Sequence, residues 1–268
     1  MPDLDPSRLQ AVQFEVGSDK IATITLNRPA AMNSFDKAMV DEFGLLWQHI
    51  ARNEDIHAVV LRAAPGRAFS TGVDTRDPNF PDPHPNDWVH EDPGVKLSPK
   101  QNRCWKPVIT AVHGLCAGGA FYWINESDIV ICSEDAQFFE PHVTYGLTAA
   151  LEPIGLSYRM PLGDVLRMAL LGNHERMSAA TALRVGLVSE VLPLPELWER
   201  AHALAALIAA QPPTAIQGTV RAIWESLDIP RSSALQGGLR YTQIGNPKGT
   251  AQVDLAAVKA KTKAFMLR

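Results

Sequence analysis

Cysteine, long hydrophobic runs and excess positive charge are all scarce in this sequence. Its 268 residues include three cysteines, Cys104, Cys116 and Cys132, without a CxxC spacing, so neither a disulfide framework nor a zinc site is expected. No apolar run approaches the roughly 20 residues that cross a bilayer. With 25 basic and 29 acidic residues the net charge is −4, which argues against general nucleic-acid binding. A local arginine or a helix N-terminus can still hold an anionic ligand.

The composition is that of a globular protein. Hydrophobic residues make up 46% and charged residues 20% of the chain, which is long enough for one large domain or a domain with an appended subdomain. The opening residues, MPDLDPSRLQ, are acidic and proline-rich where a signal peptide needs a basic and then an apolar stretch. Together with the unpaired cysteines, this favours a reducing compartment, and we expect a cytoplasmic protein.

Short β-rich segments alternate with glycine turns and helical stretches along the first two thirds of the chain. This order of strand, glycine turn, helix and strand predicts an α/β fold. The expected elements are a hairpin of 12–16 and 21–26, a helix capped by Asp36, and strands at 58–61, 108–112 and 129–132.

Two longer regions differ from this pattern. Residues 76–99 are rich in Pro, Asp, Asn and His without a period, which predicts a long surface loop that acts as a lid or binding loop. Its His84 and His90 either face a ligand or are solvated, with solvation favoured. From about Leu162 the pattern turns mostly helical. We therefore expect an α/β core over 1–195 and a helical region for packing or oligomerisation over 196–268.

Two glycine turns follow two of the predicted strands. Phe69–Asp74 reads FSTGVD, and Val112–Ala120 reads VHGLCAGGA. Glycine lets the backbone approach a ligand closely, and two such turns side by side can aim two peptide N–H groups at one carbonyl oxygen. Either turn alone is better explained as a tight connection, because short glycine motifs are weak signals.

The order of several motifs resembles the crotonase, or enoyl-CoA hydratase/isomerase, superfamily. FSTGVD is similar to the family's F-x-A-G-x-D turn. KPVITAVHGLCAGGAFYWINESDIVICSEDAQFFEP is similar to its K-P-[VI]-I-A-A-[VI]-x-G-x-A-x-G-G-G segment and the A-x-F-x-x-P strand that follows. ITLNRPAAMNS and SAATALRVGLVSEVLP resemble its opening and later segments. The matches run in the family's order over roughly residues 12–210.

The resemblance implies a crotonase-like spiral of ββα units with a helical C-terminal region that forms trimers, commonly paired as hexamers. It also implies an acyl-CoA substrate, with no metal and no tightly bound cofactor beyond the CoA of the thioester. The thioester oxygen would be held by the N–H groups of Thr71 and Gly119. The residues implied to contact CoA are Arg28, Ala30, Ala31, Met32, Thr71 and Asp74. Arg28 either meets a phosphate or is a solvated strand end, and a helix-capping role is favoured for Asp74.

The sequence departs from the family at its acid/base positions. Hydratases of this family carry two glutamates there, one to activate water and one to protonate carbon. In this chain the positions fall on Tyr122 and His142. His142 is a competent general base, and Glu152 is placed to pair with it or to act itself. Each of the three also has a purely structural explanation. Glu140, after two phenylalanines, is expected by alternation to point away from the site.

These observations favour an acyl-CoA isomerase, lyase or hydrolase that stabilises a thioester enolate or oxyanion. The alternative is a non-catalytic acyl-CoA-binding relative that has lost its acids. A serine hydrolase using Ser70 is a weaker possibility, because Ser70 lacks the G-x-S-x-G elbow.

Overall fold

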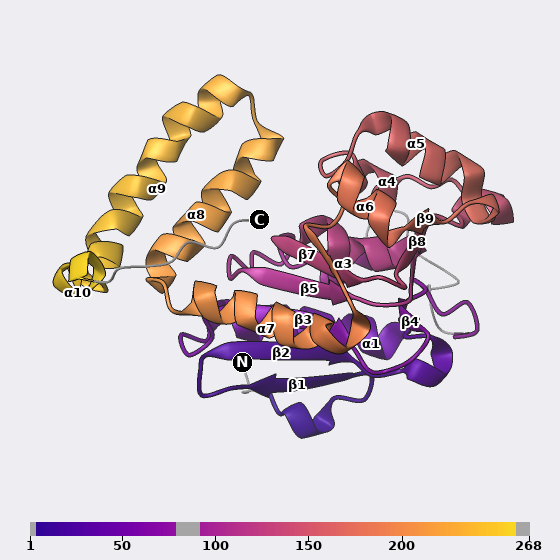
Figure 1. The fold of residues 1–268 in the computed structure, drawn as a ribbon, viewed down its shortest axis with the longest axis horizontal. Coiled ribbons are helices and arrows are strands. Elements are labelled where there is room, and N and C mark those ends of the chain that lie inside the picture. The colour runs from indigo at the N-terminus through magenta and orange to yellow at the C-terminus, as the bar shows by residue number, and fades with distance from the viewer. Residues whose placement is uncertain (1–3, 79–91, 261–268) are drawn as a thin grey trace.

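The computed structural model describes residues 4–78 and 92–260. The predicted candidates His84 and His90 therefore lie outside the described residues. Figure 1 shows a layered α/β body from which a pair of C-terminal helices projects. Within the described part of the chain, no helix has the length and apolar character needed to cross a membrane.

The body contains two β-sheets. The six-stranded sheet has the order β1-β2-β3-β5-β7-β10, parallel except for the β1–β2 hairpin. Its strands are β1 (Val12–Val16), β2 (Ile21–Leu26), β3 (Ala58–Ala63), β5 (Val108–Val112), β7 (Ile129–Ser133) and β10 (Glu190–Leu192). The four-stranded sheet has the order β4-β6-β8-β9 and comprises β4 (Ala68–Ser70), β6 (Leu115–Ala117), β8 (Gln137–Phe139) and β9 (Met177–Ser178).

The chain passes repeatedly from the larger sheet to the smaller one. β3 leads to β4, β5 to β6 and β7 to β8, and helical segments return the chain to the larger sheet. This confirms the predicted spiral of ββα units. Because β4, β6 and β8 are neighbours in the smaller sheet, the turns that follow them meet along one edge.

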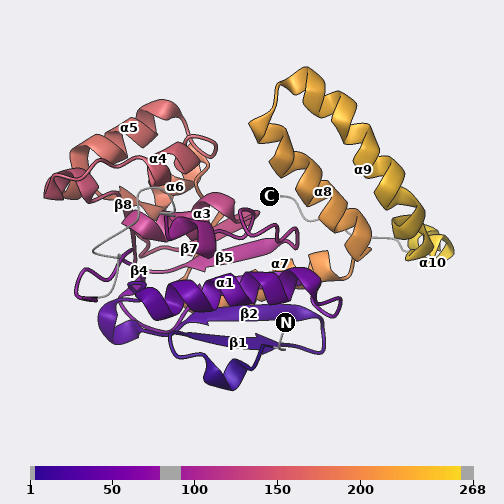
Figure 2. The same cartoon turned by 180° about the vertical axis from the view of Figure 1, so that it is seen from behind.

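Helices cover both faces of the larger sheet. α1 (Lys37–Arg52) and α3 (Phe121–Glu126) bury their apolar sides in the main core, and α1 lies in front in Figure 2. The Asp36 carboxylate accepts a hydrogen bond from the Met39 N–H at 2.9 Å, which confirms the predicted N-cap. α7 (Leu194–Ala209) packs on the opposite face through Leu197, Ala201 and Ala205. The packed core thus extends to the end of α7, beyond residue 195.

A group of short helices sits above the smaller sheet. It comprises α4 (Leu151–Leu156), α5 (Leu162–Leu171) and α6 (Ala179–Val185). Residues 92–99, expected to be loop, contain a short helix, α2 (Gly94–Leu97), whose four residues are too few to show a period.

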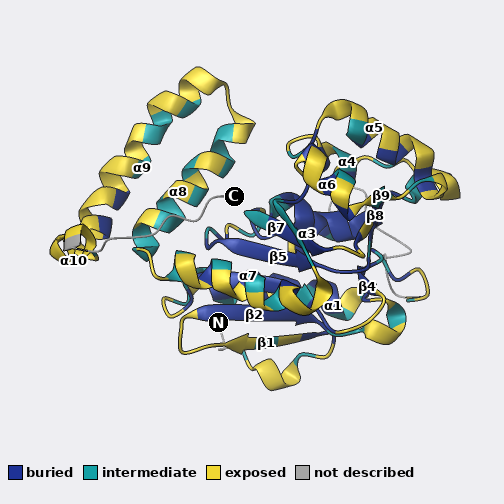
Figure 3. Cartoon of the chain, in the orientation of Figure 1, coloured by how far each residue is buried: buried dark blue, intermediate teal, exposed yellow. Residues whose placement is uncertain are grey.

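The C-terminal helices form a hairpin of α8 (Pro213–Glu225) and α9 (Arg231–Ala251), followed by α10 (Leu255–Ala260). α7 and α8 each have a proline in the first turn, where its missing N–H is no loss. Figure 3 shows that most of this hairpin is exposed. One anchor to the body is Trp224, whose indole N–H donates to Asp128 Oδ1 at 2.7 Å.

Candidate active site

The two glycine turns lie against each other at the edge of the smaller sheet. Gly72 has a φ of +82°, and a Cβ placed on it would lie 2.9 Å from the Gly119 nitrogen and 3.0 Å from the Ala117 oxygen. The Phe35 N–H donates to the Gly72 carbonyl at 2.8 Å and ties the first turn to the chain before α1. The turn containing Thr71 and the turn containing Gly119 are therefore in backbone contact, as an oxyanion hole requires.

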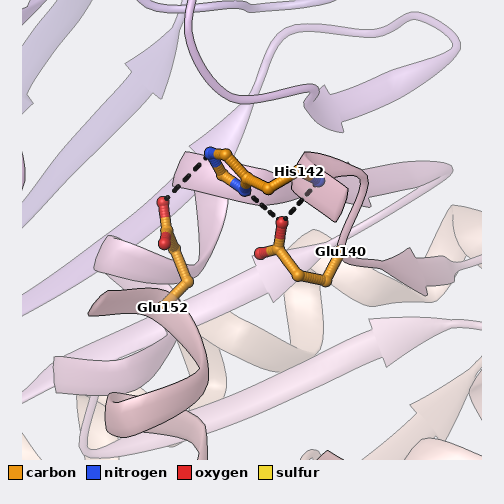
Figure 4. A group of neighbouring side chains, drawn as sticks. All are labelled: Glu140, His142 and Glu152. Atoms are coloured by element: carbon orange, nitrogen blue, oxygen red, sulfur yellow. Dashed lines mark hydrogen bonds and ion pairs between the residues drawn. The ribbon is translucent and has the colours of Figure 1, made fainter. Parts of the chain in front are cut away.

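His142 stands beside the second turn. It opens a 3-10 helix (His142–Tyr145) just after β8, and its Cε1 would lie 3.7 Å from a Cβ placed on Gly118. Its Nδ1 is hydrogen-bonded to Glu140 Oε1, which also accepts the His142 main-chain N–H at 3.2 Å (Figure 4).

The expected orientation of Glu140 was wrong. Alternation along β8 predicted that its side chain points away from the site, but the carboxylate turns toward His142 and is fully buried. The reason is that β8 ends at Phe139, so the two-residue alternation of a strand no longer applies at the Glu140–Pro141 turn.

Glu152 approaches His142 from the other side. It lies in the first turn of α4, and its Oε1 is 4.0 Å from His142 Nε2 (Figure 4). The Asn125 side chain of α3 donates to the Glu152 carbonyl at 2.9 Å and fixes this turn against the glycine-turn helix. The structure thus brings together His142 and Glu152, which the sequence placed as possible partners.

The surroundings raise the pKa values of both His142 and Glu152. The hydrogen bond to Glu140 is the largest influence and raises the pKa of His142, against the opposing effect of its partial burial. Burial raises the pKa of Glu152, and the nearby Glu140 carboxylate adds to this. A group that can accept a proton and a group that retains one unusually well therefore face each other.

Tyr122 forms the wall between the glycine turn and Glu152. Its ring would lie 3.4 Å from a Cβ on Gly119. Burial strongly raises the pKa of the Tyr122 phenol, and the nearby carboxylates of Glu152 and Asp92 raise it further. The hydroxyl therefore stays neutral and can only serve as a hydrogen-bond donor or as an acceptor through its oxygen.

Asp92 is a site residue that the sequence reasoning missed. It lies at the edge of the aperiodic loop, where its carboxylate accepts the Gly94 N–H at 2.7 Å and faces Tyr122. The Asp92-Pro93-Gly94 sequence is typical of a turn closed by an aspartate side chain, but it gives no sign that this turn faces Tyr122.

A cavity of about 450 Å3 begins beyond Tyr122 and Asp92. It lies between α3, α4, residues 92–101 and the end of α8. Its largest apolar side chains are those of Trp105, Leu151, Tyr158, Trp224 and Leu227.

Two of the residues expected to contact CoA, Arg28 and Asp74, are joined by an ion pair. Arg28 forms ion pairs with Asp74 at 2.9 Å and Asp36 at 3.2 Å, so its charge already has carboxylate partners. Ala30 and Met32 are exposed, and Ala31 is half-buried.

Asp74 does not cap a helix within the described residues 75–78, contrary to the favoured expectation. Its side chain closes a turn onto the Arg76 N–H at 3.1 Å and binds the Arg28 guanidinium. The chain after Val73 forms turns, because Asp74 satisfies the nearest N–H in a local loop instead of a first helical turn.

Ser70 is unsuited to nucleophilic attack. It is fully buried, and its hydroxyl accepts the Gly72 N–H at 3.2 Å within the turn. A substrate carbonyl cannot reach a side chain in that position without opening the turn.

Glu140, His142 and Glu152 are also the only three neighbouring residues, among those the structure describes, with the side-chain types of a metal site. One atom from each lies within 4.8 Å of the others. Nδ1 of His142 is already engaged by Glu140, however, which leaves Nε2 and Glu152 as a set too small to enclose an ion.

Comparison with known proteins agrees with this geometry. The family model for enoyl-CoA hydratase/isomerase matches residues 17–242. The chain is 32% identical to (E)-benzylidenesuccinyl-CoA hydratase of Thauera aromatica over 87% of its length and 88% of the relative. It is 35% identical to the mitochondrial Delta(3,5)-Delta(2,4)-dienoyl-CoA isomerase of Homo sapiens over 90% of its length and 75% of the relative.

A solved structure shares the fold as well. The crystal structure of an enoyl-CoA hydratase/isomerase from Mycobacterium paratuberculosis superposes with a TM-score of 0.83 at 33% identity, covering 97% of this chain and 100% of that one. The sequence motifs, the paired glycine turns and these similarities agree, and they favour an enzyme over a non-catalytic relative. The chain belongs to the enoyl-CoA hydratase/isomerase family of acyl-CoA enzymes.

Proposed function

We propose that this enzyme isomerises unsaturated acyl-CoA thioesters by moving a proton between carbons of the acyl chain. His142 and Glu152 would carry the protons, and the N–H groups of Thr71 and Gly119 would hold the thioester oxygen. The observation that supports this best is the 4.0 Å separation between His142 Nε2 and Glu152 Oε1, beside the paired glycine turns.

The reaction needs one base and one acid. Neutral His142 would accept a proton from an acidic carbon at Nε2, and the electron pair of the broken C–H bond would move into a dienolate whose negative charge rests on the thioester oxygen. Two backbone donors aimed at that oxygen stabilise the charge as it develops. Protonated Glu152 would then donate its proton to a carbon further along the conjugated chain, which restores the thioester carbonyl and shifts the double bond.

The same two groups explain how the site resets. After one turnover His142 carries the extra proton and Glu152 lacks one. Proton transfer from Nε2 to the nearby carboxylate oxygen returns both to their starting states without any external acid. Burial raises the pKa of Glu152, so its carboxylate accepts a proton more readily in this return transfer than an ordinary glutamate would.

Hydration makes a different demand, because water must be held and deprotonated while carbon is protonated. The glutamate positions that serve this purpose in the family are occupied by Tyr122 and His142. Tyr122 remains protonated and cannot deprotonate water. We therefore expect slow hydration of short straight-chain enoyl-CoAs. His142 and Glu152 together could still activate water and protonate carbon. If the enzyme proved to be a hydratase, the proposed reaction would change but the proposed residues would stay the same.

Separate surfaces would receive the CoA portion and the distal part of the acyl group. The CoA portion would lie against Arg28 and the exposed segment Ala30–Met32, with Thr71 and Asp74 nearby. The acyl group beyond the reacting carbons would enter the cavity past Tyr122, whose aromatic walls suit a branched, cyclic or aromatic group.

The test compares wild type with His142→Ala on 3-enoyl, 3,5-dienoyl and crotonyl thioesters of CoA, followed by ultraviolet absorbance and by deuterium uptake from D2O. We expect double-bond migration with deuterium incorporation, and a loss of about 10²- to 10⁴-fold in His142→Ala. His202→Ala is the control, because His202 pairs with Asp19 on the exposed surface, away from the glycine turns. Full activity in His142→Ala, or rapid crotonyl-CoA hydration without isomerisation, would contradict the proposal.

A further inference from the structure

We infer that Glu140 is a positioning residue that holds the His142 imidazole with its proton on Nδ1, so that Nε2 presents a free electron pair to the substrate. The inference rests on the proposed role of His142 as the base. Glu140 would touch neither substrate nor reacting carbon, and would act only through the imidazole.

The contacts of Glu140 are directed at one residue. Its Oε1 accepts two hydrogen bonds from His142, one from Nδ1 and one from the main-chain N–H. Two donors from the same residue converging on one oxygen fix both the position of the backbone and the rotation of the ring. A neutral imidazole whose Nδ1 donates must be unprotonated at Nε2, so this contact also selects the tautomer.

The burial of Glu140 makes a purely structural role a poor explanation. The residue has no exposed surface, and Oε2 lacks a hydrogen-bond partner among the described residues. Burying a carboxylate with an unsatisfied oxygen carries a large desolvation penalty, which an apolar side chain would avoid. This penalty is offset if the Glu140 carboxylate stabilises the positive charge that His142 gains during turnover.

The other charged groups near His142 act from different directions. Glu152 reaches it from α4 on the Nε2 side, and Asp92 contributes from the 92–99 segment at longer range. Among the described residues, Glu140 alone is hydrogen-bonded to Nδ1. Replacement of Glu140 therefore changes the tautomer and the proton affinity together, whereas replacement of Glu152 leaves the Nδ1 contact in place.

The experiment is Glu140→Gln, which keeps the size and removes the charge. His142 is followed by NMR in protein with isotope-labelled histidine, and its signals are assigned by their loss in His142→Ala. In wild type we expect neutral His142 to be protonated on Nδ1 and to titrate above 6.5, the ordinary histidine value. In Glu140→Gln we expect its pKa to fall by about one to three units, as for loss of a neighbouring opposite charge.

The pH profile of turnover should move in the same direction. The base is the neutral form, so activity falls as the pH drops through the pKa of His142. Removing Glu140 should move this acidic limb to lower pH and reduce kcat by on the order of 10²- to 10⁴-fold, because the wrong tautomer becomes accessible. KM should change much less, since Glu140 does not contact substrate.

Two controls separate this role from general damage. Asp19→Asn removes the carboxylate of a histidine–carboxylate pair on the exposed surface, and should leave the tautomer and titration of His142 unchanged. Glu152→Gln should reduce activity but keep the Nδ1–H tautomer. If Glu140→Gln fails to fold, the tautomer of wild-type His142 decides the question alone.

The outcomes distinguish the two proposals. If wild-type His142 is protonated on Nε2, or if Glu140→Gln leaves both its titration and the acidic limb unchanged, Glu140 does not position the base, even if His142→Ala is inactive. If the tautomer and the titration shift are as expected but His142→Ala is fully active, the positioning by Glu140 stands and the proposed function fails.

Discussion

Replacing Gly72 with alanine tests whether the two glycine turns form the oxyanion hole. Gly72 lies between them with a φ of +82°, a conformation that costs an L-residue about 1–2 kcal/mol. The added Cβ would also lie 2.9 Å from the Gly119 nitrogen and 3.0 Å from the Ala117 oxygen. Both neighbours are backbone atoms, so no side-chain rotation can make room.

The size of the displacement follows from these contacts. Ordinary Cβ contacts begin at 3.4 Å, so the turns must separate by about 0.5 Å at the Gly119 nitrogen. Functional groups need to be held within about 0.5 Å of the productive geometry. We therefore expect Gly72→Ala to lose most of the contribution of one oxyanion donor, about 10²- to 10³-fold in kcat.

Gly186→Ala is the matched control. Gly186 ends α6 with a φ of +85°, and its nearest neighbour to an added Cβ is the Arg159 oxygen at an ordinary 3.5 Å. Gly186→Ala should lose about 1–2 kcal/mol in free energy of unfolding, and Gly72→Ala should lose more because its Cβ also meets two backbone atoms. Only Gly72→Ala should lose catalytic activity.

The assay is steady-state kinetics on an enoyl-CoA or dienoyl-CoA that the wild-type enzyme converts. Urea denaturation of each variant gives its free energy of unfolding. If Gly72→Ala folds and matches Gly186→Ala in kcat, the contact between the turns does not serve the reaction. The assignment of the Thr71 and Gly119 N–H groups would then have to be abandoned.

Two further predictions concern the rest of the molecule. We expect a trimer or hexamer formed through residues beyond Leu162, because Leu170, Leu235 and Ile244 are 70%, 63% and 74% exposed, and a stable 29.3 kDa monomer in sedimentation at micromolar concentration would contradict this. Tyr122→Phe removes a hydrogen-bond donor that faces Glu152, so the pKa of Glu152 should rise and the limb of the pH profile that Glu152 sets should move to higher pH. Its cost in kcat should be about 10- to 100-fold, from the loss of a hydrogen bond to a charged group, and an unchanged profile would exclude Tyr122 from the proton chemistry.

Much of the larger sheet could be predicted because its strands carry strong local signals. β1, β2 and β5 have the bounds expected from alternation and turn residues. The smaller sheet could not be predicted in this way. β4, β6 and β8 have three residues each, which is too short for a two-residue alternation to be recognised, so its existence followed only from the family resemblance.

The site shows a similar division. The glycine turns could be found from sequence, because close backbone contact leaves a requirement for glycine. Asp92 could not be assigned, since nothing local shows that the edge of an aperiodic loop reaches Tyr122. Glu140 was misplaced because a strand rule was extended one residue past the strand.

This division has a physical basis that bears on how such a family can change its reaction. An oxyanion hole of peptide N–H groups depends on backbone position, so it persists with almost any side chain at Thr71 and survives replacement of the acids around it. Proton transfer depends on side chains that converge from separate elements, here from the end of β8, from α3 and from α4. Under the proposed assignment, the absence of both usual glutamates leaves the enolate-stabilising half of the site intact. The carboxylate on α4 and the histidine beside Glu140 would then supply a different proton path over the same bound thioester.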